Sequence, residues 1–233
     1  MIDRLTTRRR DRYALLLVLI LLTIVSISVS ENGTWSRVST TVLISATVLL
    51  ALRTSNARKI TIRVAFVVVI VGIAASLYAA ATGTTDGAVD WTTNVMTMML
   101  AAVVPLTIAR ELWRHPKVTA STVMGALCIY LLLGVVFALL YGFAADISGD
   151  PFFVQTAHPD ASDYVYFSYV TMATVGYGDL TARGSPERML AALEGLIGQL
   201  YLVTVVAVLV SNLGHDRTIG ARGHDAAAGN DDE

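Results

Sequence analysis

Long apolar runs separated by short polar segments dominate this chain of 233 residues. A helix that crosses a hydrocarbon core of about 30 Å needs about 20 mainly apolar residues. The second apolar run carries five hydroxyl side chains between Ser39 and Thr47, which can bond back to helical carbonyls in an apolar setting. The pattern therefore predicts an all-α membrane protein with six transmembrane helices, at residues 13–29, 35–52, 64–81, 91–109, 119–143 and 189–210.

Composition supports a location in lipid. The chain is 55% hydrophobic and 15% charged, which is too apolar for one soluble domain with a solvated surface. Its 17 basic and 18 acidic residues nearly balance, which argues against nucleic acid as a partner. The one cysteine, Cys128, cannot form an intrachain disulfide. Because Cys128 lies inside an apolar run, we expect a buried, unreactive thiol.

Basic residues occur in every other loop between the predicted helices. They cluster before the first helix, at residues 53–63 and at residues 110–117, whereas the loops between these clusters are acidic. Short loops rich in arginine and lysine stay on the cytoplasmic side. This predicts cytoplasmic N- and C-termini in a multi-pass protein of the plasma membrane.

The N-terminus has a second interpretation. An arginine-rich start, an apolar run and the small-residue triplet Ser28-Val29-Ser30 also resemble a secretory signal. The apolar run is longer than a usual signal core, which favours a retained helix. Cleavage would leave five helices and a mature start near Glu31.

The stretch Thr174-Val175-Gly176-Tyr177-Gly178-Asp179 interrupts the segment between the last two predicted helices. A run of carbonyl oxygens can replace the hydration shell of a cation only if successive peptides point toward one axis. Glycine takes positive φ at little cost, so Gly176 and Gly178 permit that conformation. The Thr174 hydroxyl adds one oxygen at the inner end.

These residues resemble the selectivity filter of potassium channels. The resemblance extends to residues 166–173, which are similar to that family's pore helix, and to residues 194–201, which are similar to its inner helix; together it covers about Thr119 to Leu213. It implies a re-entrant pore helix, at about Ser162 to Ala173, and a filter loop between the fifth and sixth helices. It also implies a homotetramer with K+ as permeant ion and no cofactor. The K+ ligands it implies are Thr174, Val175, Gly176 and Tyr177, with Gly178 completing the filter and Asp179 at the outer mouth.

In this family two tryptophans and a threonine commonly support the filter from behind. The matching positions here hold Tyr166, Phe167 and Ala173, of which Phe167 and Ala173 have no side-chain hydrogen-bonding group. We therefore hypothesise a filter that inactivates or loses selectivity more readily than in voltage-gated relatives.

Glu194 lies inside an apolar segment, where an ionisable group is a functional candidate. One hypothesis is a brace that hydrogen-bonds to the pore helix through Ser168 or Thr171, which would also make Thr171 a filter support. The other is a carboxyl held neutral by desolvation, which contributes only packing. Gly195 and Gly198 allow either a gating hinge or the close approach of a neighbouring helix, and we favour packing.

The remaining segments predict little chemistry. Asp146, Asp150, Asp160 and Asp163 form an acidic loop that would draw cations toward the mouth.

The fourth predicted helix has no basic residue before Arg110, so strong voltage sensing is not expected. Four segments follow from this pattern: a cytoplasmic N-terminus at 1–12, a four-helix domain at 13–118, a pore domain at 119–213 and a disordered polar tail at 214–233.

The prediction is a potassium-selective channel subunit and not an enzyme, since neither a nucleophile with a base nor a phosphate-binding loop is evident. Three alternatives stay open. These are a weakly selective cation channel, a subunit of a potassium uptake system and a non-conducting regulatory subunit. The gating stimulus, the direction of rectification and the role of the first four helices cannot be read from the sequence.

Overall fold

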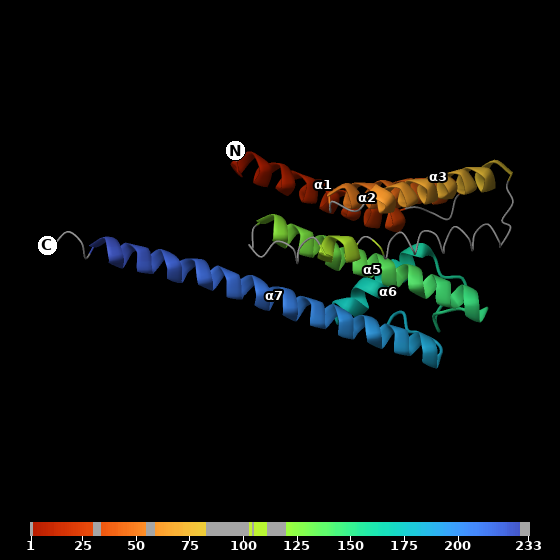
Figure 1. The fold of residues 1–233 in the computed structure, drawn as a ribbon. Coiled ribbons are helices and arrows are strands. Elements are labelled where there is room, and N and C mark those ends of the chain that lie inside the picture. Colours follow the sequence, from red (N-terminus) through yellow and green to blue (C-terminus); the bar gives the residue numbers. More distant parts are fainter. Residues whose placement is uncertain are drawn as a thin grey trace.

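The computed structural model describes the backbone of residues 2–29, 34–54, 59–82, 103, 105–110 and 120–228 and, within these ranges, most side chains between 13 and 208. The named elements in these ranges are all helices (Figure 1): α1 (Ile2–Val29), α2 (Thr34–Thr54), α3 (Lys59–Thr82), α5 (Ala120–Ser148), α6 (Ala161–Met172) and α7 (Ser185–Ala228). The predicted all-α class is therefore confirmed for the part of the chain that is described.

The helices form two groups. α1, α2 and α3 lie together on one side of the molecule, and α5, α6 and α7 lie on the other (Figure 1). Helix α1 contacts α2 within its own group and both α5 and α6 across the boundary, while α5 contacts α6 and α7. Helix α1 therefore joins the N-terminal helices to the segment that carries the filter motif.

Five of the six predicted stretches coincide with helices. Helices α1, α2, α3, α5 and α7 contain or overlap the stretches predicted at 13–29, 35–52, 64–81, 119–143 and 189–210. Most of the fourth stretch, 91–109, lies outside the described residues. The short helix α6, Ala161–Met172, agrees with the pore helix predicted at about Ser162 to Ala173.

Length and composition separate two of the described helices from the others. Thr122–Ser148 of α5 and Ser185–Val208 of α7 are long and apolar enough to cross a membrane. Within α1, α2 and α3, the apolar stretches found among the described side chains are shorter, at Tyr13–Ser28, Val42–Arg53 and Ala65–Ala74. Six membrane crossings consequently stay a prediction.

Two hydroxyl groups of the second predicted stretch, among the side chains that the structure describes, face the protein interior. Ser45 and Thr47 are buried, and the Thr47 hydroxyl donates to the Leu43 carbonyl at 2.9 Å. On α1, Thr23 donates to the Leu19 carbonyl at 2.8 Å, and its oxygen lies 3.4 Å from the Thr47 hydroxyl. The expected back-bonding of hydroxyls to helical carbonyls is thus present. Cys128 is also fully buried, as predicted.

Helix α7 extends further than predicted. It continues to Ala228, whereas the sequence suggested a disordered tail from Gly214. That prediction is corrected for residues 214–228. Extending an existing helix needs no new nucleation, and after Pro186 the helix contains no further proline. The arginine-rich segment before Tyr13 is likewise helical, from Ile2.

Candidate ion pore

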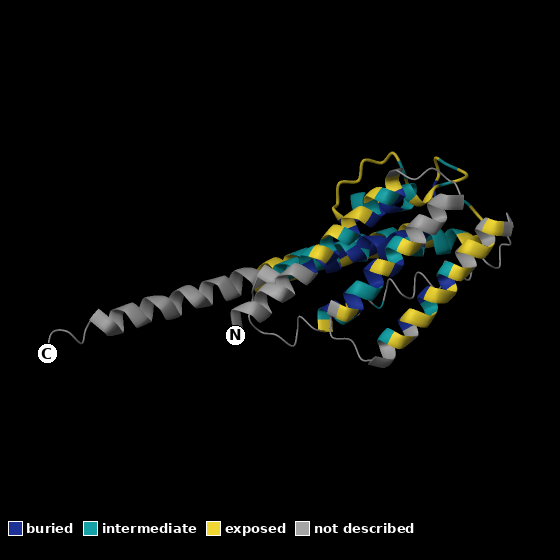
Figure 2. Cartoon of the chain, turned by 90° about the horizontal axis from the view of Figure 1, so that it is seen from above, coloured by how far each residue is buried: buried dark blue, intermediate teal, exposed yellow. Residues whose placement is uncertain are grey.

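The pore helix α6 begins at a capped N-terminus. Asp160 is the N-cap residue, and its N–H donates to the Asp163 carboxylate at 3.0 Å. A carboxylate in the first turn also interacts favourably with the helix dipole. Asp160 and Asp163, predicted as part of an acidic loop, therefore also fix where the helix starts. Asp146 and Asp150 are exposed before it, and the loops on either side of α6 are mostly exposed (Figure 2).

The backbone after α6 turns back on the end of that helix. The N–H groups of Thr174 and Val175 donate to the carbonyls of Thr171 and Val170, both at 2.9 Å, and the Gly176 N–H donates to Val170 at 3.4 Å. In a trans peptide the carbonyl points opposite to the N–H, and none of the described peptide bonds is cis. The carbonyl oxygens of Ala173, Thr174 and Val175 therefore point away from the pore helix.

Positive φ occurs at every second residue of the motif. Gly176 has φ 56° and Gly178 has φ 80°, as the glycine positions predicted. Thr174 also has φ 56°, which the sequence did not suggest because β-branched residues rarely take that conformation. Positive φ therefore alternates with ordinary φ from Thr174 to Gly178. The side chains of Val175 and Tyr177, which lie between these positions, are 51% and 71% exposed.

The outer end of the motif is joined to the pore helix by one side-chain bond. The Tyr166 hydroxyl donates to the Asp179 carboxylate at 2.7 Å. This bond raises the pKa of Tyr166 to about 12, because the neutral phenol donates to the carboxylate. Tyr166 and Asp179, which the sequence suggested separately as filter support and outer mouth, are thus hydrogen-bonded to each other.

Phe167 is held by packing instead of hydrogen bonding. Its ring lies 5.3 Å from Tyr141, 5.9 Å from Phe152 and 5.1 Å from Phe153, measured between centroids. Such edge-to-face contacts stabilise a buried cluster beyond the area that they cover. Ala173, the third predicted position, is exposed at the C-cap of α6, where its N–H donates to Tyr169 at 2.9 Å.

The loop before α6 and the loop after the motif pair with each other. Phe153 and Ala182 form an isolated antiparallel bridge, and the Val154 N–H donates to Thr181 at 3.0 Å. The Arg183 N–H donates to Phe152 at 2.8 Å. This pairing brings together the two ends of the segment that contains α6 and the filter motif.

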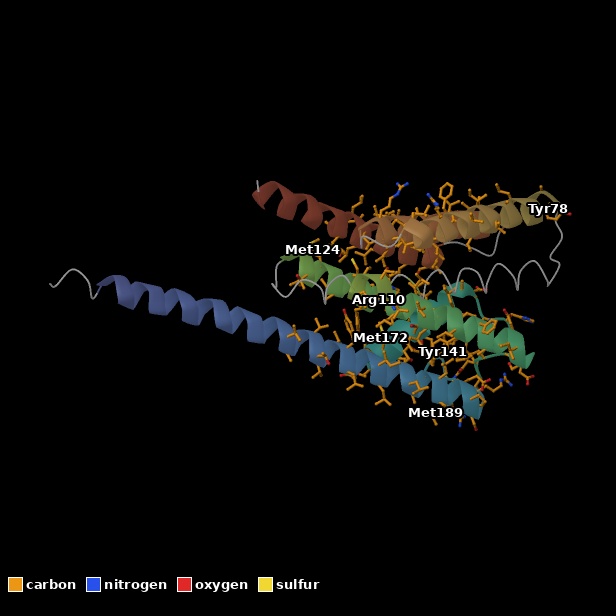
Figure 3. All side chains as sticks on the ribbon, in the orientation of Figure 1. Tyr78, Arg110, Met124, Tyr141, Met172 and Met189 are labelled. Carbon is orange, nitrogen blue, oxygen red and sulfur yellow. The ribbon has the colours of Figure 1, made fainter. Side chains whose placement is uncertain are left out.

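Glu194 connects three helices. It is completely buried, accepts a hydrogen bond from the Tyr141 hydroxyl of α5 and contacts the Ser168 hydroxyl of α6. Figure 3 shows Tyr141 in the region where these helices meet. Of the two expected partners on the pore helix, the structure forms the contact with Ser168. Sequence reasoning missed Tyr141, which is 53 positions away.

Ser168 has one hydroxyl hydrogen and two neighbouring acceptors, because its oxygen also lies 2.7 Å from the Gly134 carbonyl. With an ionised Glu194, Ser168 donates to the carboxylate. With a neutral Glu194, the carboxyl donates to Ser168, which then donates to Gly134. Both arrangements satisfy the buried groups and connect Glu194 to α6, so the geometry fits a brace with either an ionised or a neutral carboxyl.

The predicted glycines lie where α7 meets the end of α6. A Cβ added at the buried Gly198 would stand 2.5 Å from Met172 Cγ and 3.0 Å from the Met172 carbonyl oxygen. At Gly195 it would lie 3.8 Å from the Thr171 carbonyl. Gly198 therefore permits a close approach that a side chain would prevent, in agreement with packing. Beside it, the Gln199 amide donates to the Thr174 hydroxyl at 3.3 Å, a contact the sequence did not suggest.

Comparison with known proteins agrees with this geometry. Residues 125–214 match a family model described as an ion channel. The chain is 34% identical over 82 residues to the inward rectifier potassium channel Kirbac3.1 of Paramagnetospirillum magnetotacticum, covering 35% of this chain and 26% of that protein. It is 35% identical over 105 residues to two pore potassium channel a of Oryza sativa subsp. japonica, covering 45% and 27%. Residues 125–214 are thus similar to ion channels, and the relatives that match are potassium channels.

The match coincides with the pore region predicted at about 119–213 and so confirms the resemblance. A further relative, the voltage-gated potassium channel KCNC1 of Mus musculus, is 34% identical over 98 residues, covering 38% of this chain and 18% of that channel. The chain thus spans between 18% and 27% of the length of these curated relatives. The match to the ion channel model and the two long apolar helices together indicate a membrane protein.

Proposed function

We propose that this chain is one subunit of a homotetrameric, potassium-selective channel that conducts K+ passively through a filter of backbone carbonyls. The observation that carries the proposal is the backbone after α6. Amides of Thr174, Val175 and Gly176 are tied back to the pore helix, which directs the carbonyls of Ala173, Thr174 and Val175 to the opposite side. A row of such oxygens can replace the water around a dehydrated K+ ion.

The surroundings of the filter favour a cation. The C-terminal carbonyls of α6 carry partial negative charge close to Thr174. Asp179 adds a carboxylate at the other end, and its bond to Tyr166 holds it beside the filter. We assign the K+ ligands to Thr174, Val175, Gly176 and Tyr177, with Gly178 completing the filter.

A single chain offers one row of oxygens and encloses nothing. The filter side chains Val175 and Tyr177 are exposed, and so are Leu196, Leu200 and Val203 of α7, at 61%, 66% and 65%. Apolar side chains exposed to this extent need cover from lipid or from another protein surface. A closed ring of identical chains supplies that cover and brings the filter rows together around one axis.

The proposal extends to topology. We assign six membrane crossings with both termini in the cytoplasm, because the arginine-rich flanks alternate along the chain. This orientation puts Asp179 outside the plasma membrane, as a filter entered from that side requires. The N-terminal helices α1, α2 and α3 form a membrane domain that packs on the pore through α1.

Glu194 is assigned as a brace of the filter. Through Ser168 it connects the pore helix to α7, and through Tyr141 it connects both to α5. A displaced pore helix would move the amide partners of Thr174 and Val175, so the brace acts on the filter without touching the ion.

A flux assay with the purified full-length protein in liposomes tests the function. Vesicles loaded with K+ should release it down its gradient, and Ba²⁺, which is close to K+ in size with twice its charge, should block the release. Native mass spectrometry of the same preparation should give four copies. An equal leak of Na+, or a monomer that conducts, would contradict the proposal.

A further inference from the structure

Gln199 is the one carboxamide between Met189 and Val208 of α7. Polar amides inside an apolar span are costly unless they find a partner. Gln199 is exposed in the single chain, on the same side of α7 as Leu196 and Val203, which follow at helical spacing. Its amide nitrogen donates to the Thr174 hydroxyl at 3.3 Å. The residue therefore reaches the first position of the filter.

The position of Gln199 is set by the residue before it. Gly198 is buried against Met172, and an added Cβ would come within 3.0 Å of the Met172 carbonyl oxygen. Met172 is the last residue of α6, and Thr174 follows two positions later. Figure 3 shows Met172 between the pore helix and α7. The backbone at Gln199 is thus held at a fixed distance from Thr174.

Thr174 itself has little freedom in its backbone. Its φ of 56° is unusual for a β-branched residue, and its N–H is engaged by the Thr171 carbonyl at 2.9 Å. Its side chain, in contrast, can change rotamer about the Cα–Cβ bond, which moves the hydroxyl oxygen. A threonine hydroxyl binds a cation through a lone pair of that oxygen, so the ion site needs the oxygen at one fixed place.

We infer that Gln199 is a positioning residue of the innermost ion site. By donating to the Thr174 oxygen, its amide holds the Thr174 side chain in one rotamer and so fixes the place of the hydroxyl oxygen, whose second lone pair is left for the cation. The inference rests on the proposed channel function and deepens it. The site takes a dehydrated monovalent cation, or a divalent cation of the same size.

Binding of Ba²⁺ to the purified full-length protein in K+-free detergent solution, followed by calorimetry, tests the inference without needing an open pore. Gln199→Met keeps the length of the side chain and removes the donor. Losing one such hydrogen bond should weaken Ba²⁺ binding about threefold to tenfold. Leu193→Met, at an exposed position of the same helix, is the matched control and should bind like the parent.

A double-variant cycle tests whether Gln199 affects Ba²⁺ binding through the Thr174 hydroxyl or through another contact. In a Thr174→Val background the hydroxyl is absent, so Gln199→Met should cause no further weakening. Gel filtration and thermal melting check that each variant is assembled. If Gln199→Met does not assemble, Gln199→Asn replaces it, because the shorter side chain cannot bring its amide to the Thr174 hydroxyl.

The results distinguish a failure of the role inferred for Gln199 from a failure of the proposed channel function. Parent-like Ba²⁺ binding by Gln199→Met overturns the inference, and so does equal weakening in the Thr174→Val background. A parent protein that binds neither Ba²⁺ nor K+ overturns the channel function itself, which is visible before any variant is compared.

Discussion

Two of the contacts that hold the pore helix α6 differ in their access to water. At the outer place Tyr166, which is 38% exposed, donates to Asp179 beside the filter. At the inner place Ser168 and Glu194 are fully buried, and Glu194 contacts both the Ser168 hydroxyl and the Tyr141 hydroxyl. Water can replace a lost hydrogen bond at the outer place but not at the inner one. Removing a buried partner leaves polar groups unsatisfied, which costs more than the bond itself contributed.

This difference in access to water suggests that the two contacts have different roles. We propose that the buried contact among α5, α6 and α7 holds the pore domain together and that the exposed contact adjusts the outer end of the filter. The two places therefore differ in what their loss should change: assembly in the first case and the durability of the conducting state in the second.

The largest effect is expected for Glu194→Ala. It removes an acceptor from Tyr141 and a partner from Ser168 and leaves a cavity, so the loss of stability should be about 2–4 kcal/mol. The tetramer fraction and the melting temperature of the detergent-solubilised protein measure this change. Parent-like values for both would rule out a structural brace.

Glu194→Gln is the control that separates charge from hydrogen bonding. Glutamine keeps the shape, accepts from Tyr141 and donates to Ser168. We expect assembly and K+ flux within about twofold of the parent, because the carboxamide reproduces the neutral form of the network. If Gln fails as Ala does, the carboxylate charge is required and the ionised arrangement holds.

A smaller effect is expected for Tyr166→Phe. The ring stays and the donor to Asp179 is lost, in a place that water reaches. Assembly should be unchanged, while the decay of current during sustained recording should become about twofold to fivefold faster. An unaltered time course would show that the outer contact does not support the conducting filter.

The smallest effect is expected for Phe167→Trp, which restores the aromatic donor common in the family. Phe167 is already packed among Tyr141, Phe152 and Phe153, so a larger ring gains a donor but strains the cluster. Current decay should slow by about twofold or less. An unchanged decay would contradict the hypothesis that a weakened support behind the filter promotes inactivation.

Much of this architecture follows from local pattern. Apolar run lengths located the helices, and Gly176 and Gly178 indicated positive φ, because both properties depend on neighbouring residues alone. Glu194 was identified as unusual by its apolar surroundings, and Ser168 as one of its two expected partners.

Other features depend on which helix faces meet, and no local pattern encodes that. Tyr141 reaches Glu194 from another helix, and Phe153 pairs with Ala182 across the whole filter segment. The positive φ of Thr174 contradicts the preference of its side chain and is maintained by contacts with α6. The continuation of α7 beyond Gly214 was missed because polar composition was interpreted as disorder.

We propose that backbone oxygens of four copies select K+ over Na+. This selectivity is measured by the bi-ionic reversal potential of the purified protein in a planar bilayer, with K+ on one side and Na+ on the other. We expect a reversal potential displaced strongly in the direction set by K+, carried by a current that Ba²⁺ blocks. A reversal potential near zero would show that the pore does not distinguish the two ions.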